Sequence, residues 1–529
     1  MNTNTGSTKN LKNDRGSPET TLRDWIAKNA QDNPNKVFIQ SVDQNKAITF
    51  SQFKTVCDRI ANFLYSRNFG PNDRIAMLSN NSIQHLCIYI GGMAYGATVC
   101  TIHVEMNAIY FEKILKALDP KLILFDECET RVDSDILKTG TQGEWFTLGD
   151  WNSNGSKGGF YEELEKYPAQ TLEPISRWED DASIYYTSGT ASAPKGCIVT
   201  FRELITNTAP TAEGLGLTKD DRILEFRAFN WISAQVLSGL APLSKGATII
   251  LAKRFSQSRY FDWIRKYKVT IGVCNPTGLA MLLNRPIAVH HNDIPHLRFM
   301  TSSSAPLMPE TWKQFEEHYG IPVAQGYGCS EIGWIAVSDE NSRKFGTVGK
   351  PLEYHKLTVI NSDGGIVADG EVGEIELGGF EINQYRYLDE FGEEKIHAHN
   401  RLRTGDLGII DDDGCVIVTG RAKDLIIRGG VNISPAEVDN ILLQMPSLGE
   451  AATIGVPDQI YGEEVVCYVA PKPKSKLTPE DVLEHCAERL PKFRAPKQVI
   501  IRPKLPKTER GKMNRLLLQK EWQEEFGTK

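Results

Sequence analysis

The sequence has no long apolar run, no surplus of positive charge and no paired cysteine motif. Its most apolar stretch, residues 86–100 (LCIYIGGMAYGATVC), contains three glycines and is too short to cross a bilayer. We expect a buried helix running into a buried strand there, and no membrane span. The 60 basic and 67 acidic residues leave a net charge of −7, which gives no indication of a nucleic-acid partner.

Disulfide and zinc patterns and a targeting signal are missing as well. The ten cysteines are scattered without a CxxC pair, which indicates reduced thiols in a cytoplasmic protein and no zinc site. Residues 1–20 are polar and lack the apolar core of a signal peptide, so we expect a disordered tail. His397 and His399 could form a metal pair, but the nearby sequence suggests no third ligand and a surface loop is favoured.

The chain of 529 residues is too long for one hydrophobic core, so two or more domains are expected. As far as about residue 350, apolar strand-like runs such as residues 121–127, 247–252 and 269–275 alternate with helical patterns. This alternation predicts α/β layers with parallel sheets. Asp-Gly turns between short strands then predict hairpins. A boundary near residues 421–424 would separate a domain of residues 21–423 from a small domain of residues 424–529.

One loop, TSGTASAPKG at residues 187–196, has a composition suited to holding phosphate. It follows an apolar strand and contains two glycines, two threonines, two serines and one lysine. The Walker A pattern GxxxxGK[ST] does not fit, because the lysine precedes a glycine and neither Ser nor Thr follows it. An ordinary P-loop ATPase is therefore disfavoured. Taken alone, a loop of this composition is more often a plain surface turn.

Four further stretches follow the loop in a fixed order: QGYGCSE (325–331), RTGDLG (403–408), GRAKDLIIRGGVNISPAEVD (420–439) and PKTERGKMNR (506–515). Together the five stretches resemble the motifs of the acyl-adenylate-forming superfamily, which includes acyl-CoA synthetases, peptide-synthetase adenylation domains and firefly-type luciferases. The resemblance covers nearly the whole chain. It implies a large N-terminal domain of two doubly wound α/β subdomains plus a small distorted β-barrel, followed by a small mobile α+β C-terminal domain.

The resemblance also implies ATP, Mg²⁺ and CoA as ligands. The family's phosphate loop is TSG[ST]TGxPKG, and here Ala191 and Ser192 replace a threonine and a glycine, so one hydroxyl is lost. Hydroxyl and backbone N–H groups of the loop would surround the β- and γ-phosphates, and its lysine would add positive charge. The residues implied around the phosphates are Thr187, Ser188, Gly189, Thr190 and Lys195.

The later motifs are implied to bind the rest of the nucleotide. Tyr327 would stack on adenine, and Glu331 would coordinate Mg²⁺. Asp406 would accept hydrogen bonds from both ribose hydroxyls, and a hairpin at residues 413–414 would return Arg421 to the same end. By itself, QGYGCSE would also suit a strand-to-turn segment with a surface glutamate. The remaining residues implied to bind nucleotide are Ser304 and Ala305, in a stretch resembling the family's SGGAPL, with Gly326, Gly328, Cys329 and Ser330.

The C-terminal motifs are implied to provide catalysis and movement. Lys512 would neutralise charge on the carboxylate and the α-phosphate, although a solvated basic tail is the plain alternative. Asp424 occupies the family's hinge position. Rotation there would withdraw Lys512 and bring Gly429 and Gly430 toward the acyl-adenylate, where glycines would leave a narrow tunnel for pantetheine.

The acid is harder to predict. The segment FRAFNW lacks the aspartate of amino-acid-activating relatives, since Asn230 stands there, and it lacks the Pro-Leu-x-His of fatty-acid relatives. Arg227 could pair with a distal carboxylate or sulfonate, and Trp231 and Trp334 could instead flank a quaternary ammonium group. These features favour a short polar or charged acid. Equally, Arg227 could belong to a structural ion pair and the tryptophans to the core.

Three functions therefore remain open at the level of sequence. The first is an acid:CoA ligase, favoured by the glycine pair and by the absence of a carrier-protein domain. The second is a stand-alone adenylation enzyme that loads a carrier protein. The third is a nucleotide-binding relative without catalysis, and luciferase-like oxidation has no recognisable motif. The sequence leaves open whether the protein is a monomer or a homodimer.

Overall fold

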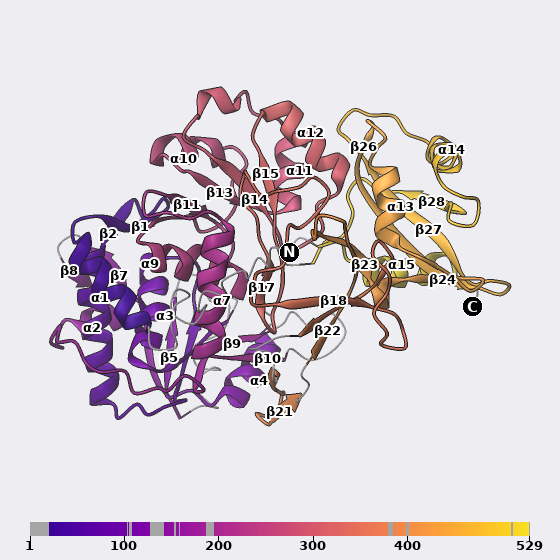
Figure 1. The fold of residues 1–529 in the computed structure, drawn as a ribbon. Coiled ribbons are helices and arrows are strands. Elements are labelled where there is room, and N and C mark those ends of the chain that lie inside the picture. The colour runs from indigo at the N-terminus through magenta and orange to yellow at the C-terminus, as the bar shows by residue number, and fades with distance from the viewer. Residues whose placement is uncertain are drawn as a thin grey trace, which may run out of the picture.

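The computed structural model describes residues 21–102, 104, 108–126, 142–152, 155–157, 159–186, 195–378, 385–397, 401–508 and 512–527. Figure 1 shows a large N-terminal part, with the smaller C-terminal lobe (orange to yellow) beside it. Residues 1–20, where we expect a disordered tail, lie outside the described residues.

A seven-stranded sheet forms one layer of the large part. Its pairs are parallel except for β1 with β2, and its central strands are buried, as expected for apolar runs in a covered parallel sheet. In spatial order the strands are β15 (Val323–Gln325), β14 (Phe299–Ser302), β13 (Ile271–Cys274), β11 (Arg222–Glu225), β12 (Thr248–Leu251), β1 (Val37–Ser41) and β2 (Lys46–Thr49).

An eight-stranded sheet forms the second layer. The β9–β4–β3–β5–β6 side is parallel, and β10, β20 and β21 extend it as antiparallel strands. In spatial order the strands are β21 (Glu394–His397), β20 (Tyr385–Leu388), β10 (Gly196–Thr200), β9 (Asp181–Tyr186), β4 (Thr98–Ile102), β3 (Arg74–Leu78), β5 (Leu122–Phe125) and β6 (Glu144–Thr147).

The remaining strands form antiparallel sheets, apart from one parallel pair, β27 with β28. Two short ribbons are β7 (Asp150–Asn152) with β8 (Gly155–Lys157) and β16 (Tyr327–Cys329) with β17 (Gly333–Ala336). A four-stranded sheet contains β18 (Lys356–Ile360), β19 (Gly373–Gly378), β22 (Arg401–Ile410) and β23 (Val416–Arg421). The C-terminal sheet contains β25 (Val431–Ile433), β24 (Ile426–Arg428), β27 (Gly462–Pro471), β26 (Leu448–Asp458) and β28 (Gln498–Ile501).

Helices cover these sheets, and several begin at threonines whose side chains cap them, as at α1, α2, α7 and α14. The helices are α1 (Leu22–Asp32), α2 (Phe50–Ser66), α3 (Ile83–Tyr95), α4 (Ala108–Leu118), α6 (Gly159–Leu164), α7 (Phe201–Gly214), α8 (Ile232–Ala234), the π-helix η1 (Gln235–Leu240), α9 (Ala241–Lys245), α10 (Tyr260–Tyr267), α11 (Pro276–Asn284), the 3-10 helix η2 (His291–Asp293), α12 (Pro309–Tyr319), the 3-10 helix η3 (Ala422–Asp424), α13 (Pro435–Leu442), α14 (Pro479–Arg489) and α15 (Arg515–Phe526).

One continuous hydrophobic core joins the two large sheets. It contains Phe63 of α2 and Leu86 of α3 together with Ile39 of the seven-stranded sheet and Ile75 of the eight-stranded sheet. The expected buried helix and strand within residues 86–100 are confirmed, because α3 and β4 are buried along their whole lengths. Within the described residues, no helix is both long and apolar enough to span a bilayer.

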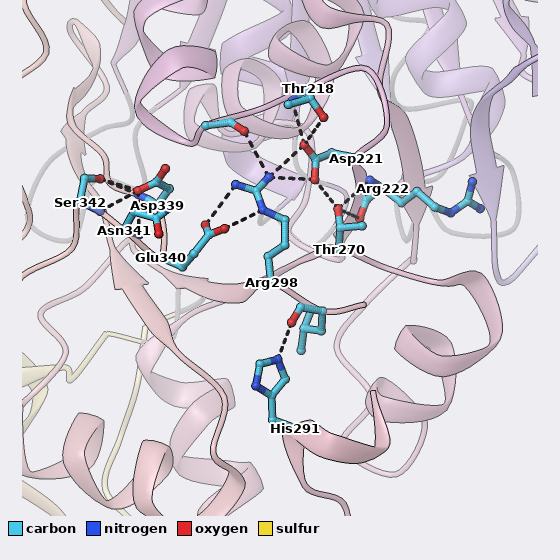
Figure 2. A network of polar contacts seen from close by, with 12 residues as sticks. Thr218, Asp221, Arg222, Thr270, His291, Arg298, Asp339, Glu340, Asn341 and Ser342 are labelled. Carbon is cyan, nitrogen blue, oxygen red and sulfur yellow. Dashed lines mark hydrogen bonds and ion pairs between the residues drawn. The ribbon is translucent and has the colours of Figure 1, made fainter. Parts of the chain in front are cut away.

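Figure 2 shows a polar network at the amino ends of β11, β13 and β14. The Arg298 guanidinium donates to both oxygens of Asp221 at 2.9 and 3.0 Å and to both oxygens of Glu340 at 2.8 and 3.1 Å. Thr270 Oγ1 donates to Asp221 Oδ1 at 2.7 Å. The network fastens the segment after β17 to the sheet, at the edge opposite to the predicted site.

The predicted fold class is confirmed: an α/β chain with a large N-terminal domain and a smaller C-terminal domain. The four-stranded antiparallel sheet lies within residues 356–421, where the sequence predicts hairpins. The helix η3 contains the position of the predicted boundary between residues 423 and 424. That boundary stays a prediction.

Candidate active site

The candidate site lies at the carboxyl edge of the seven-stranded sheet. Residues 226–231 follow β11, residues 303–306 follow β14, and residues 326–331 follow β15. Because β11, β13, β14 and β15 run parallel, these segments leave the sheet at the same edge. Ligands of open α/β sheets bind at this edge. The topology therefore brings three separate stretches of the sequence into one region.

Asp406 is the point where three of the predicted motifs meet. The Tyr327 hydroxyl donates a hydrogen bond to Asp406 Oδ2 at 2.7 Å, and Arg421 Nε lies 2.8 Å from Oδ1. Asp406 and Arg421 are direct partners in the β22–β23 hairpin, so the predicted return of Arg421 is confirmed. Only 6% of Asp406 is exposed. Each carboxylate oxygen can still accept one more hydrogen bond, as a ribose diol requires.

Tyr327 has a contact that the sequence did not indicate. Burial, followed by the nearby charge of Asp406, raises the pKa of Tyr327, so its hydroxyl remains a donor. The ring is partly buried on the short strand β16. Stacking of this ring on adenine stays a prediction.

Glu331, the predicted magnesium ligand, is held by a tyrosine. Tyr387 Oη donates to Glu331 Oε1 at 2.7 Å. Tyr387 lies on β20 opposite Cys197 of β10, the strand that begins directly after the phosphate loop. Lys195 Nζ lies 5.9 Å from the centre of the Tyr387 ring. Cys197 Sγ donates to the carbonyl oxygen of Ser330 at 3.3 Å, so this strand pair contacts both the loop and the QGYGCSE segment.

Most of the phosphate loop lies outside the described residues. This holds for Thr187, Ser188, Gly189 and Thr190 and for the replacements Ala191 and Ser192, so their roles stay predictions. The two ends of the loop are described. Tyr186 of β9 is paired with Gly196 of β10, so the loop leaves from and returns to adjacent strands.

Gly326 and Gly328 occupy positions without room for a side chain. A Cβ at Gly326 would lie 2.6 Å from Trp334 Cζ3, and a Cβ at Gly328 would lie 2.2 Å from the Gly333 carbonyl oxygen. Trp334 is 2% exposed, and its indole N–H donates to the Ser233 carbonyl at 3.2 Å. Trp334 is therefore a buried wall between residues 231–233 and the QGYGCSE segment, and it also belongs to the main core.

Arg227 has a buried counter-ion. Its guanidinium contacts both oxygens of Glu225, with Nη2 2.7 Å from Oε2, and Nη1 donates to Ser303 Oγ at 2.8 Å. Glu225 is fully buried and also accepts a hydrogen bond from Ser238. Of the two alternatives left open, the structure contains the ion pair. A substrate anion would therefore meet Arg227 as a hydrogen-bond donor whose charge is already balanced.

Asn230 has an unsatisfied polar atom. It is 7% exposed, and its Oδ1 has no hydrogen-bond partner among the described residues. Trp231, the next residue, is half-buried and immediately precedes α8. Such an orphaned atom at the carboxyl edge of the sheet is suited to a ligand or a bound water.

Ser304 has a strained backbone. Its φ is +74°, a left-handed conformation that glycine adopts easily and that serine rarely adopts. In the stretch SSSAPL (302–307), which resembles the family's SGGAPL, Ser304 stands in place of a glycine. Ser304 is exposed and Ala305 half-buried, between β14 and α12. Strain of this kind is concentrated at functional sites.

The proposed hinge and tunnel residues lie together in the sequence of the C-terminal lobe. Asp424 ends η3, and Gly429 and Gly430 form the turn between β24 and β25 with φ of +58° and +82°. Both values are left-handed, which explains the glycine pair. Gly429 N donates to the Tyr461 carbonyl at 2.8 Å, which ties the hairpin to the β26–β27 turn.

Lys512 is held through its main chain in the C-terminal lobe. Its N–H donates to Thr508 Oγ1 at 3.2 Å, and its carbonyl accepts from Thr508 N at 2.8 Å. Lys507 and Met513 form a β-bridge that closes this segment. Further along, the Arg515 guanidinium contacts Asp439 and anchors the start of α15.

Three residues of this region had not been singled out from the sequence: Tyr387, Glu225 and Asn207. Asn207 donates to the Trp334 carbonyl at 2.8 Å and accepts from its N–H at 3.0 Å, which fixes that tryptophan. The sequence offers only a weak signal for them, namely a polar residue within an otherwise apolar pattern. For the pair His397 and His399, the His397 side chain and residues 398–400 lie outside the described residues.

Comparison with known proteins gives the family of the chain. The chain matches the family AMP-binding enzyme over residues 26–383 and the AMP-binding enzyme C-terminal domain over residues 437–512. Sulfoacetate–CoA ligase of Cupriavidus necator is 32% identical over 519 residues, which is 96% of this chain and 99% of that protein. Oxalate–CoA ligase of Arabidopsis thaliana is 29% identical over 486 residues, or 90% and 94% of the two chains.

The fold is shared with solved structures. ATP-bound MatB from Rhodopseudomonas palustris has a TM-score of 0.85 at 24% identity, over 95% of this chain and 99% of that chain. The first family match covers more than half of the residues, and the relative from Cupriavidus necator matches along nearly the full length. The chain belongs to the AMP-binding enzyme family.

Proposed function

We propose that this chain is an ATP-dependent acid:CoA ligase for a short carboxylic acid that carries a second charged group. In the first half-reaction the carboxylate attacks the α-phosphorus of ATP, the bond to pyrophosphate breaks, and an acyl-adenylate forms. In the second, the CoA thiol attacks the acyl carbonyl and AMP leaves. The observation that carries the proposal is the convergence of Tyr327 and Arg421 on the buried carboxylate of Asp406.

Asp406 suits the ribose of ATP. A carboxylate presents two acceptor oxygens, and here one donor already orients each of them. The guanidinium of Arg421 contacts Oδ1 of Asp406 and fixes the orientation of the carboxylate. Gly326 and Gly328 allow Trp334 and the Gly333 carbonyl to pack closely against the segment that bears Tyr327, beside which adenine would lie. The nucleoside is thus bound at the sheet edge and its phosphates extend toward β9 and β10.

Glu331 fits a Mg²⁺ ion that is shared with the phosphates. Mg²⁺ usually takes one or two carboxylates plus substrate phosphate oxygens. Glu331 is a partly exposed carboxylate oriented by Tyr387, and within the described residues no group of three or more His, Cys, Asp or Glu could form a separate cage. Bound Mg²⁺ would neutralise phosphate charge, and Lys195 adds to this at the end of the phosphate loop.

Lys512 is proposed as the catalytic residue of the first half-reaction. Its ammonium would neutralise charge on the carboxylate and the α-phosphate oxygens as the pentavalent transition state forms. Rotation at Asp424 would then replace Lys512 by the Gly429–Gly430 turn. The space around Gly430 is open, because a Cβ added there would have no atom within 4 Å, and this supports close approach of a pantetheine arm.

The acid is proposed to be short and to carry a second anion, such as a sulfonate or a carboxylate. Two relatives act on such acids by name, sulfoacetate and oxalate. In this chain the buried Trp334 would limit the length of the acid. Asn230 and the Nη1 edge of Arg227 would offer polar groups to it. Because Glu225 balances the charge of Arg227, these groups would distinguish acids by hydrogen bonding and size more than by net charge.

CoA is proposed as the acceptor and the cytoplasm as the compartment. The relatives are CoA ligases by name, and the nine cysteines among the described residues are all free thiols, as a reducing compartment requires.

The test is an end-point assay of AMP and thioester with ATP, Mg²⁺, CoA and a panel of acids. The panel contains sulfoacetate, oxalate, acetate and octanoate, and wild type is compared with Lys512→Ala. We expect thioester from a short dianionic acid and loss of adenylation in the variant. Best activity with octanoate would refute the substrate class. AMP without thioester would indicate a carrier-protein acceptor, and absence of AMP with every acid would favour a non-catalytic relative.

A further inference from the structure

Tyr387 contacts two residues of the proposed nucleotide site from outside every recognised motif. Its hydroxyl donates to Glu331 Oε1 at 2.7 Å, and Lys195 Nζ lies 5.9 Å from its ring centre. Residue 387 is 56 positions from Glu331 in the sequence, and the pairing of β20 with β10 brings the two together. The hydroxyl and the ring therefore face different charged partners.

A lone carboxylate needs such a partner if it is to hold Mg²⁺ well. The terminal torsion of a glutamate is broad, so an unrestrained carboxylate turns freely and can offer one oxygen or both. Mg²⁺ requires near-ideal octahedral geometry, whereas Ca²⁺ accepts two oxygens of one carboxylate in flexible arrangements. A donor on one oxygen of Glu331 fixes the plane of the carboxylate and favours coordination through a single oxygen.

The surroundings keep this donor in place. Tyr387 lies on β20, which pairs with β10, so the strand pairing holds its hydroxyl beside Glu331. Cys197, directly opposite Tyr387, binds the carbonyl oxygen of Ser330 and so fixes the residue before Glu331. The carboxylate is thus positioned both through its own oxygen and through its backbone.

We infer that Tyr387 is a positioning residue for Glu331, one that sets the affinity and selectivity for Mg²⁺ in the ATP-consuming half-reaction. The inference rests on the proposed function. A merely structural hydrogen bond would affect folding and both half-reactions alike. A positioning role acts only while the metal and the phosphates are present, because pyrophosphate has left before the thiol attacks. A structural role therefore predicts losses in both half-reactions, and a positioning role predicts a loss only in the ATP-consuming one.

The experiment measures ATP binding to the full chain by calorimetry across a Mg²⁺ titration, and repeats it with Ca²⁺. Partners that orient metal ligands typically contribute 10–100-fold in metal affinity. We expect Tyr387→Phe to raise the half-saturating Mg²⁺ concentration about 10-fold and to raise that for Ca²⁺ much less. Thioester formation from synthetic acyl-adenylate and CoA should stay at the wild-type rate.

Two further variants make the result decisive. Tyr468→Phe is the matched control, because Tyr468 is buried and its hydroxyl has no partner among the described residues. The double variant Glu331→Gln with Tyr387→Phe should bind Mg²⁺ no more weakly than Glu331→Gln alone, since the tyrosine acts through that carboxylate.

The possible failures are distinguishable. If wild type binds ATP equally well with and without Mg²⁺, the metal role of Glu331 in the proposed function is wrong and the inference falls with it. If ATP binding by wild type depends on Mg²⁺ and Tyr387→Phe has the same half-saturating Mg²⁺ concentration, only the inference is wrong. Equal losses in both half-reactions would also overturn it, because they would indicate a structural role.

Discussion

Single residues of the site act in pairs, each a carboxylate with a tyrosine. Asp406 accepts from Tyr327, and Glu331 accepts from Tyr387. In both pairs burial raises the pKa of the phenol, so it donates at all physiological pH values. A carboxylate that already has one donor loses less freedom when a ligand arrives, which favours binding. The site is in this respect organised before ATP binds.

The first prediction concerns Asp406. Because hydrogen bonds to charged groups contribute roughly 1.5–3 kcal/mol, Asp406→Asn should weaken AMP binding about 10- to 100-fold. Tyr327→Phe removes only the orienting donor and should weaken binding about 2- to 10-fold. Calorimetric titration with AMP checks both. Unchanged AMP affinity in a folded Asp406→Asn protein would show that the ribose lies elsewhere.

The second prediction concerns Trp334 and the length of the acid. Trp334→Leu should create space beside Gly326, where Trp334 now packs. The ratio of kcat/KM for four- to six-carbon acids over two-carbon acids should then rise at least about 10-fold. Trp312→Leu is the matched control, since Trp312 is equally buried but belongs to a different core cluster. A similar ratio in both variants would mean that Trp334 acts only in packing.

At the scale of elements, local sequence patterns predicted individual strands and one hairpin. They did not predict which distant strands pair. The apolar runs became β5, β12 and β13, and the Asp-Gly turn became the β22–β23 hairpin, because period and turn chemistry are local. The pairing of β10 with β20 is different. It joins residues about 190 positions apart, and no periodicity encodes it. Tyr387 could not be predicted as a site residue for that reason.

The third prediction uses the buried helix α3 and is a pH dependence. Burial lowers the pKa of His85 from 6.5 to about 4, and Ser79 Oγ lies 2.8 Å from its Nδ1. The unfolded chain therefore binds this proton more tightly than the folded chain, so stability is present above the unfolded pKa of 6.5 and is lost as pH falls toward 4.

From these values, His85 should contribute a loss of about 2 kcal/mol between pH 7 and pH 5. The variant His85→Gln removes the titrating group, so its thermal midpoint should fall less over this range. Scanning calorimetry at several pH values measures this, and His318→Gln, on the exposed surface, should follow wild type. Parallel curves for His85→Gln and wild type would show that His85 titrates normally in the fold.

At the scale of the whole molecule, five short motifs in order were sufficient to predict the family and the two-domain plan. The two family matches, over residues 26–383 and 437–512, cover both predicted parts of the chain. The interior contacts that complete the site were not predictable. The ion pair between Glu225 and Arg227 decides whether the charge of Arg227 is available to a substrate. Amino-acid composition does not predict such a pair.

The last prediction assigns the two half-reactions to two different segments of the C-terminal lobe. If Lys512 serves adenylation and the Gly429–Gly430 turn serves thioester formation, each half-reaction should have its own sensitive residue. Lys512→Ala should abolish acyl-adenylate formation and leave thioester formation from synthetic acyl-adenylate intact. Gly430→Leu should do the opposite, with a loss of about 100-fold in the second step, since small misplacements near a reacting group have effects of that size.

Strain alone could also impair Gly430→Leu, because φ at this position is +82°. Gly414→Leu is the matched control: Gly414 has φ of +77°, and like Gly430 it has open space around it, but it lies at the tip of the β22–β23 hairpin. Both variants carry a similar backbone cost, and at both positions an added Cβ would have no atom within 4 Å. If Gly430→Leu alone loses the second step, the turn must approach the acyl-adenylate during the cycle. Equal behaviour of the two variants would remove the reason for a domain rotation at Asp424.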